Sequence, residues 1–417
     1  MNRSPVSRTS NIFYGWWVVL AGFVIMGLCV GIVSNCASQF IKPIAEEYGW
    51  SRASVSTINT IFSGCYMVIS FMAGKVLNRP DLHRLMKIAL FVMCGSYFAY
   101  SFCTSLPMFY ANTLIVGLAA PLLGVLAFSV VIPNWFVEQR GKAIGLSFMG
   151  SGVGGMIFNY LTGQWIIQYG WRNTYRILAV CLFFGLAPFV FKVLRVRPSD
   201  MGLEALGAHR AEGFAGKEEE QGGIAFKEAV RSSKLWILCL AIAAFNICSY
   251  CNMQTISPHL TDVGYSAMFG ATMVSLAMGS LAIGKLSLGV LIDKVGAKRA
   301  TLMSAFSYTL GLAGLLFCKA KFMLPLILIG TCLGTAFGSV AIPIITEGVF
   351  GRKDYAAIYG FISGATSLVS TFNPTLANLV FDGVGSYEPC YIAGITLSLV
   401  AAYIFWSFFT KLEKGTL

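Results

Sequence analysis

Twelve apolar stretches, each long enough to cross a lipid bilayer, run through this 417-residue chain. A hydrocarbon core about 30 Å thick takes about 20 residues of α-helix, at about 1.5 Å of rise per residue. Because the backbone must satisfy its own hydrogen bonds inside the bilayer, the pattern predicts an all-α membrane protein with twelve transmembrane helices. The expected spans are residues 16–40, 53–74, 86–104, 108–132, 143–164, 174–194, 235–257, 268–290, 299–318, 323–346, 355–378 and 388–409.

The composition agrees with this interpretation. Hydrophobic residues make up 56% of the chain and charged residues 12%, whereas soluble domains carry about 25% charged residues. The twelve cysteines lie mostly in apolar stretches, where cysteine acts as a small hydrophobe. Cys248 and Cys251 form a C-x-x-C motif without a second pair of ligands, so we expect no metal and no cofactor.

The longest polar stretch, residues 195–234, divides the chain into two parts. It contains the charged run 217–220 and several glycines, which suits a solvated cytoplasmic linker. The prediction is an N-terminal six-helix half at residues 1–194 and a C-terminal six-helix half at residues 235–417. Within the linker, residues 226–230 are expected to form a short surface helix.

Lysine and arginine are distributed unevenly over the two ends of the spans. With both termini on one side, that side receives 24 of the 30 basic residues. The positive-inside rule then predicts that both termini lie in the cytoplasm, with the protein in the plasma (inner) membrane. These loops account for the net charge of +12, and we expect no nucleic-acid partner.

An internal repeat relates the two halves. A constant shift of 215 residues aligns residues 49–84 with residues 264–299 without gaps. Parallel six-helix repeats indicate a secondary transporter whose substrate site lies between the halves, near the membrane midplane. On this alignment Ser70 is the counterpart of Lys285. The identical pairs are Gly49 and Gly264, Ser51 and Ser266, Thr57 and Thr272, Gly64 and Gly279, Gly74 and Gly289, and Arg84 and Arg299.

Lys285 is the charge placed deepest in the predicted spans. It lies eight residues before Asp293, which is expected at the membrane surface, so it is about 12 Å deep and near the middle of the core. A charge at that depth is costly and usually lines a cavity or ion path. The alternative is that the long stem carries the ammonium back to the surface.

Residues 289–299 resemble the signature loop of the major facilitator superfamily, G-x-L-x-D-x-x-G-x-K/R-R. The first-half copy at residues 74–84 is degenerate, with Asn78 in place of the acid. The resemblance implies the major facilitator fold.

Asp293 is predicted to hold the two halves together at the cytoplasmic side, as a latch, by accepting hydrogen bonds from basic residues or from a helix N-terminus. The alternative is that these charges only set the topology. The predicted cytoplasmic gate comprises Asn78, Arg79, Arg84, Glu138, Arg140, Asp293, Lys294, Arg299, Glu347 and Arg352, with Glu138/Arg140 and Glu347/Arg352 pairing locally.

A second resemblance is narrower. Residues 134–145 with the glycine-rich run 150–154, residues 14–17 and residues 197–202 resemble the monocarboxylate and oxalate–formate porter families. In those families a helix-8 base four residues before the signature glycine binds the substrate carboxylate, and Lys285 has that position before Gly289. Their further charges are missing here, since Leu281, Asn35 and Ser363 occupy the corresponding positions. A single cation suits a single carboxylate.

The remaining polar groups in the spans are expected to hold the rest of the ligand; the alternative for each is an interhelical hydrogen bond worth about 0.6 kcal/mol. With Lys285, the predicted substrate-binding residues are Asn35, Gln39, Asn59, Ser63, Tyr66, Asn246, Tyr250, Ser363 and Ser367.

These residues predict a carrier for a small organic anion, a monocarboxylate, that works by alternating access. No acid lies deep in any span, so coupling falls to Lys285, by proton symport or by exchange against a counter-anion. Two alternatives stay open: an exporter of neutral or drug-like metabolites with a structural Lys285, and a non-transporting membrane sensor. An enzyme is not expected, because no nucleophile–base pair or metal ligand set lies at membrane depth.

Overall fold

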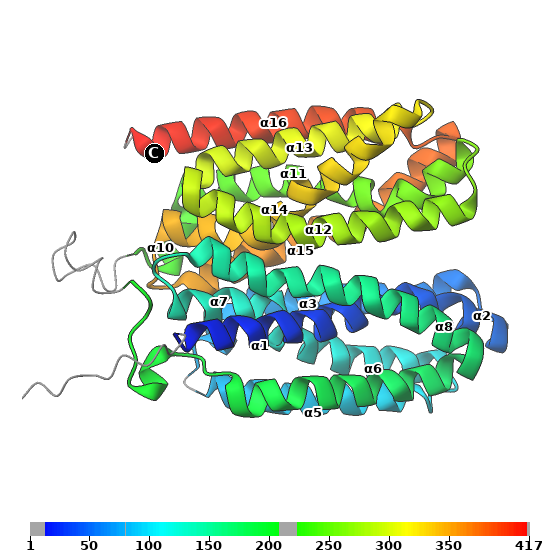
Figure 1. The fold of residues 1–417 in the computed structure, drawn as a ribbon, viewed down its shortest axis with the longest axis horizontal. Helices are drawn as coiled ribbons and strands as arrows, with labels where there is room; N and C mark the ends of the chain where they lie inside the picture. Colours follow the sequence, from blue (N-terminus) through cyan, green and yellow to red (C-terminus); the bar gives the residue numbers. More distant parts are fainter. Residues whose placement is uncertain (1–12, 80, 208–222, 415–417) are drawn as a thin grey trace, which may run out of the picture.

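A computed structural model describes residues 13–79, 81–207 and 223–414, without the side chains at 53, 248–254, 267, 370, 372, 374–376, 378, 379 and 382. In this part of the chain the structure is a bundle of long helices, as predicted (Figure 1). The helices of the N-terminal half are α1 (Gly15–Leu28), α2 (Ile41–Tyr48), α3 (Arg52–Phe71), α4 (Ala73–Leu77), α5 (Leu82–Tyr100), α6 (Leu106–Ala119), α7 (Val125–Trp135) and α8 (Arg140–Pro188). Those of the C-terminal half are α11 (Ser233–Asp262), α12 (Ala267–Val295), α13 (Ala297–Leu316), α14 (Leu324–Phe350), α15 (Tyr355–Val384) and α16 (Glu388–Glu413).

Four predicted spans have interrupted or joined helices. The first begins as α1 and continues through a π-helical turn at Cys29–Ser34 into α2. The fourth is divided into α6 and α7. The fifth and sixth run together in α8, where Gly170 with φ +75° makes the break between them. Glycine adopts this backbone conformation without the steric cost that a Cβ would bring.

The helices form two groups that lie side by side (Figure 1). Contacts between the groups are concentrated in two pairs, α8 with α12 and α3 with α15. We call the end of the bundle that holds the start of α1 and the end of α16 the terminal end, and the opposite end the far end. The domain boundary at residues 195–234 stays a prediction.

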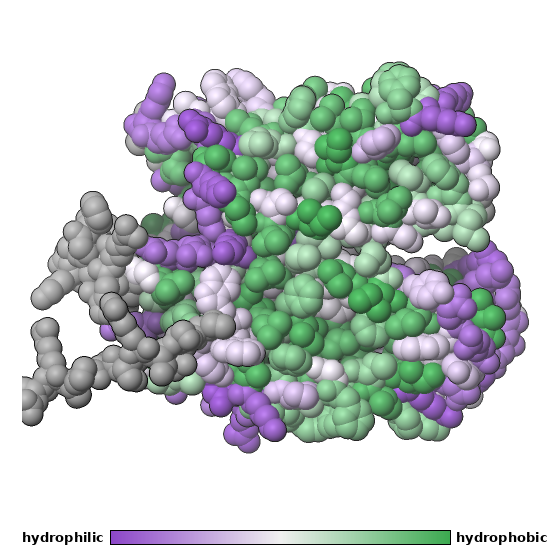
Figure 2. All heavy atoms as spheres, viewed as in Figure 1, coloured by the Kyte–Doolittle hydropathy of each residue, from purple (hydrophilic) through white to green (hydrophobic). Residues whose placement is uncertain are grey.

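The face of the bundle seen in Figure 2 is covered mainly by apolar side chains, and polar side chains gather at its two ends. Seven of the described helical segments are by themselves long and apolar enough to cross a membrane, and one of them, Arg140–Val193, has the length for two crossings. With α5, α11, α13 and α15 they account for the twelve predicted spans.

Both ends of the linker attach to loops at the terminal end. Leu206 pairs with Phe136 in the loop between α7 and α8, and Ile224 donates a hydrogen bond to the Phe350 carbonyl at 3.1 Å. A short helix, α10 (Phe226–Arg231), then begins, and the Asp354 carboxylate accepts a 2.8 Å bond from the Phe226 amide. The predicted surface helix at residues 226–230 therefore coincides with α10.

The glycine-rich run in α8 brings helices to backbone contact. A Cβ built at Gly154 would overlap the carbonyl of Gly27 in α1, and one at Gly145 would lie 2.5 Å from the Lys285 carbonyl in α12. Small residues at such positions allow the close helix packing typical of membrane bundles. Helix α8 therefore touches α1 on one side and α12 of the other half on another.

The contact at Gly154 generates a stability prediction. We expect Gly154→Ala to lower the melting temperature of the detergent-purified protein, because overpacking costs about 1–3 kcal/mol. Gly64→Ala in α3 is the matched control, since a Cβ there meets nothing within 4 Å. Its melting temperature should stay the same or rise, as alanine favours helix over glycine. Equal melting temperatures for the two variants would contradict a rigid α1–α8 contact.

Candidate functional site

A large cavity of about 1220 Å³ lies between the two halves at the far end. Figure 2 shows the surface hollowed between the halves on this side. Its described lining carries amides, hydroxyls and aromatic rings but no charged side chain. The lining includes Asn35, Gln39, Asn59, Ser63, Tyr97, Tyr175, Ser275, Met278 and Thr371.

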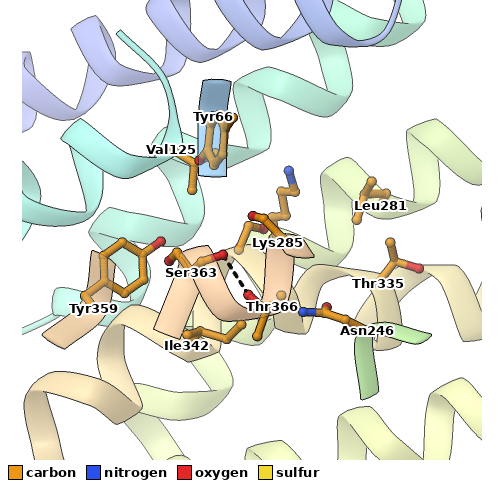
Figure 3. Close-up of a pocket in the computed structure, with 13 residues that line it drawn as sticks. Tyr66, Val125, Asn246, Leu281, Lys285, Thr335, Ile342, Tyr359, Ser363 and Thr366 are labelled. Carbon is orange, nitrogen blue, oxygen red and sulfur yellow. Dashed lines mark hydrogen bonds between the residues drawn. The ribbon is translucent and has the colours of Figure 1, made fainter. Parts of the chain in front are cut away.

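A smaller cavity of about 330 Å³ contains Lys285 (Figure 3). Its lining continues the lining of the large cavity by about one helical turn on three helices. On α3 the step is from Ser63 to Tyr66, and on α15 it is from Thr371 to Ser367. On α12 the lining runs from Met278 through Leu281 to Lys285. The small cavity is thus the inner end of a path that opens at the far end, and we call it the inner cavity.

The Lys285 ammonium is held inside the bundle by the other half of the protein. The residue is 7% exposed, and its Nζ donates a 2.6 Å hydrogen bond to Ser151 Oγ on α8. Among the described residues no carboxylate lies within 4 Å of it. In this conformation the side chain does not carry its charge to the surface. A buried charge with one neutral partner is costly, which makes this ammonium a strong attractor for an anion.

Ser151 is itself supported by two contacts. Its hydroxyl donates to the Phe148 carbonyl at 2.8 Å, and its carbonyl accepts from Asn35 Nδ2 at 3.3 Å. Asn35 follows the π-helical turn after α1, so the chain of bonds joins three helices. The glycine-rich run 150–154 predicted only close packing, and nothing in its spacing distinguished Ser151 as a partner for a charge.

The structure divides the predicted substrate residues into two groups. Lys285 shares the inner cavity with Tyr66, Asn246, Ser363 and Ser367. Asn35, Gln39, Asn59 and Ser63 line the large cavity instead. The side chain of Tyr250 lies outside the described residues.

Interhelical hydrogen bonds, the alternative considered for these residues, occur at two of them. Gln39 Nε2 donates to the carbonyl and to Oδ1 of Asn159, at 2.8 and 2.7 Å, and Asn35 bonds Ser151 as described. Both residues nevertheless line the cavity. Short hydroxyl residues that the sequence did not single out also line the inner cavity, namely Thr335, Ser339 and Thr366.

The terminal end is closed, and Asp293 forms part of the closure. Its Oδ1 accepts from the Gly141 amide at 2.8 Å, and its Oδ2 accepts from the Lys142 amide at 2.7 Å. Both amides belong to the first turn of α8, where helix N–H groups lack intrahelical partners and the helix dipole favours an anion. The carboxylate of one half therefore caps a helix of the other, in the geometry that a latch requires.

Glu347 forms a second closing contact. Its buried carboxylate lies 2.7 Å from Arg140 Nη1 across the interface and accepts a 2.7 Å bond from Arg352 Nε in its own half. The local pairing expected for Glu347 and Arg352 is present, whereas Arg140 pairs with the opposite half rather than locally. Glu138 lies half-buried beside Gly207.

The other predicted gate residues do not join these contacts. In the described part of the chain they are exposed, and no ion pair involves them: Asn78, Arg79, Arg84, Lys294 and Arg299.

Two tyrosines close the path between the inner cavity and the terminal end. Tyr355 donates to the Ser129 carbonyl at 2.9 Å, and the Ser129 hydroxyl lies 3.1 Å from the Tyr359 hydroxyl. Ser129 is on α7 and both tyrosines are on α15, so these bonds also cross between the halves. Tyr359 lines the inner cavity (Figure 3). The conformer is therefore open at the far end and closed at the terminal end.

Comparison with known proteins decides the family. Residues 23–346 match the family model described as Major Facilitator Superfamily. The chain belongs to the major facilitator superfamily. It is a membrane-embedded secondary transporter and not an enzyme. The twelve-helix fold predicted from the spans and the signature loop is confirmed.

Solved structures and curated relatives agree with this assignment. The proton:xylose symporter XylE, solved with 6-bromo-6-deoxy-D-glucose, has a TM-score of 0.73 at 13% identity, over 95% of this chain and 96% of that one. Monocarboxylate transporter 12-B of Danio rerio is 21% identical over 415 residues, covering 92% of this chain and 85% of the relative. Riboflavin transporter RibJ of Trypanosoma cruzi is 24% identical over 200 residues, which is 47% of this chain and only 41% of RibJ.

The Asp293 contact generates a gating prediction. We expect Asp293→Asn to weaken the cap on α8 and to raise terminal-end labelling of a cysteine at position 143, about 3- to 10-fold. Ala143 is fully buried beside this contact, and a neutral hydrogen bond of the kind asparagine keeps is about 1 kcal/mol weaker than a charge-assisted one. The measurement is the rate of reaction with a membrane-impermeant maleimide in a background without the natural cysteines.

Asp354→Asn is the matched control for gating. Asp354 also caps a helix with its carboxylate, but it holds α10 and does not cross between the halves. Its labelling rate should equal that of the parent. If Asp293→Asn labels no faster than this control, Asp293 is only a loop charge.

Proposed function

We propose that this transporter carries a small organic anion, a monocarboxylate, and that Lys285 binds its carboxylate. The observation that carries the proposal is a buried ammonium in the inner cavity that has a serine hydroxyl and no described carboxylate as its partner. Charge-assisted bonds to an anion are roughly twice as strong as bonds between neutral groups. A carboxylate entering from the far end would therefore replace a weak partner with a strong one.

The charged residues that line the two cavities support a ligand with one negative charge. Lys285 is the one charged residue among the described residues that line either cavity. A second carboxylate on the ligand would be buried without a counter-charge, at a cost of several kcal/mol. The similarity to a protein named as a monocarboxylate transporter, at 21% identity over 92% of this chain, points in the same direction.

The contacts between the halves support alternating access. With both termini in the cytoplasm, as the basic residues indicate, the conformer is open to the outside and closed to the cytoplasm. Lys285 and Ser151 belong to opposite halves, so a ligand that draws the ammonium from Ser151 removes one bond between them. Rocking of the halves would then break the Asp293 and Glu347 contacts and open the terminal end.

The same lysine can couple transport to protons. Burial favours the neutral amine, whereas a bound carboxylate favours the ammonium. The carrier would return empty with a neutral lysine and move loaded with a neutral lysinium–carboxylate pair, which amounts to proton symport. A lysine that stays charged makes the empty carrier costly to reorient, and that version gives anion exchange. We propose symport.

Removal of the Lys285 charge tests the substrate site. We expect Lys285→Ala to reduce uptake of labelled monocarboxylates into proteoliposomes to background, and Lys285→Arg to retain part of it because the charge remains. Lys75→Ala, which removes an exposed lysine on α4, is the control and should transport like the wild type. Wild-type uptake by equal amounts of reconstituted Lys285→Ala protein would refute the anion site.

A gradient experiment separates symport from exchange. Symport predicts that an inward proton gradient drives net uptake into vesicles without internal anion, since each carboxylate brings one proton with it. Exchange predicts uptake only into vesicles preloaded with a counter-anion. Strong accumulation by preloading alone, with no response to the pH gradient, would eliminate symport while leaving the anion site intact.

A further inference from the structure

Short polar residues of the C-terminal half make up much of the lining of the inner cavity, and we call them the polar wall. The aliphatic residues of the same lining are Val125, Leu281 and Ile342. The polar members come from α11, α14 and α15 and are Asn246, Thr335, Ser339, Ser363, Thr366 and Ser367. Ligand pockets usually have mostly apolar walls with a few polar groups. A wall with this many hydroxyls suits a ligand that is polar along its whole length.

We infer that the anion carried by this protein is a polyhydroxylated monocarboxylate, of the sugar-acid type, rather than an unsubstituted alkanoate. The inference rests on the proposed function, in which Lys285 takes the carboxylate. The hydroxyl groups along the rest of the ligand would bond the polar wall.

The first support is an unused hydroxyl in that wall. Thr335 Oγ1 is shielded from solvent and has no hydrogen-bond partner among the described residues. Thr335 lies close to Asn246 and Leu281 on the side of the cavity away from Tyr359 (Figure 3). A buried polar group left without a partner costs about 1–3 kcal/mol. Rotation of the Thr335 side chain about χ1 would bring this hydroxyl to a ligand hydroxyl and remove the cost, whereas an alkyl chain would preserve it.

The second support is the direction of the other hydrogen bonds. Thr366 Oγ1 donates to the Ser363 carbonyl at 3.0 Å (Figure 3), and Ser339 Oγ donates to the Ala336 carbonyl at 3.3 Å. A hydroxyl that has given its proton to the backbone has only acceptor capacity left. At Ser339 the wall can therefore only accept a bond from the ligand, which carbonyl and ether oxygens cannot donate.

Of the ligand groups that can donate a hydrogen bond, a hydroxyl suits the charge of the inner cavity best. An ammonium group would also donate, but it would share the cavity with the Lys285 cation, and no acid is present among the described lining residues. A neutral O–H group donates without adding charge. The volume of about 330 Å³ is at the lower end of the range for ligand sites, roughly 300–1,000 Å³, so the ligand is a short chain.

The experiment compares gluconate with hexanoate, two six-carbon monocarboxylates that differ in their hydroxyl groups. Affinities are measured from the rise in melting temperature of the purified full-length protein with ligand concentration. We expect gluconate to bind at least about tenfold more tightly than hexanoate. Sites built for hydroxyls reject analogues that lack them much more strongly than apolar sites reject an added hydroxyl.

Thr335→Val tests the wall directly. It removes a hydroxyl that no described residue bonds, so folding should be preserved, while gluconate affinity should fall about 3- to 10-fold. Hexanoate affinity should stay the same or rise. Thr331→Val, one turn away on α14, is the matched control: Thr331 is fully buried, bonds the helix backbone and does not line the cavity. It should leave the affinities for both acids unchanged.

Lys285→Ala separates failure of this inference from failure of the proposed function. If hexanoate binds as tightly as gluconate and Lys285→Ala weakens both, the anion site stands and the polyhydroxylated ligand is wrong. Wild-type gluconate affinity in Thr335→Val would also overturn the inference. If neither acid binds, or Lys285→Ala binds both like the wild type, the anion site fails, and the inference fails with it.

Discussion

Helices α8 and α12 touch at backbone distance, and both the gate and the substrate site depend on this contact. Gly141 and Gly289 meet near the terminal end, and Gly145 meets the Lys285 carbonyl further in. Because the two helices are this close, Asp293 reaches the first turn of α8 and Lys285 reaches Ser151. The partner of Lys285 and the Asp293 contact of the terminal-end closure therefore depend on one helix pair, one helix from each half. A change in how these helices pack alters both at once.

The closure at the terminal end is divided among contacts of different strength. Asp293 is exposed to solvent and caps a helix, while Glu347 is buried and pairs with two arginines. The tyrosine–Ser129 bonds lie deepest, against the inner cavity. Such bonds individually contribute about 0.5–3 kcal/mol. A carrier must break all of them in each cycle, and ligands shift such equilibria only by the difference in their affinities for the two states. Several moderate contacts meet that requirement better than one strong contact.

The cavities combine one charge with many neutral hydrogen-bonding groups. The charge supplies strong attraction at one point, while the hydroxyls and amides supply selectivity along the ligand. The polar wall belongs to the C-terminal half, and the partner of the lysine belongs to the N-terminal half. A ligand that satisfies both therefore interacts with both halves, which is the arrangement that lets binding influence their relative movement.

The sequence by itself determined the helices and the fold, and it predicted that Lys285 is the charge placed deepest in the spans. Length and hydropathy define a membrane helix, since the bilayer thickness imposes the length. The signature loop identified Asp293 as a candidate gate residue. Only the tertiary structure decided which side chains meet. The partnership of Lys285 with Ser151, the crossing of Arg140 to Glu347 and the free hydroxyl of Thr335 depend on how each helix is rotated about its axis. Helices that are apolar on all faces carry no periodic signal for that rotation, so contacts between residues far apart in the chain are decided by packing.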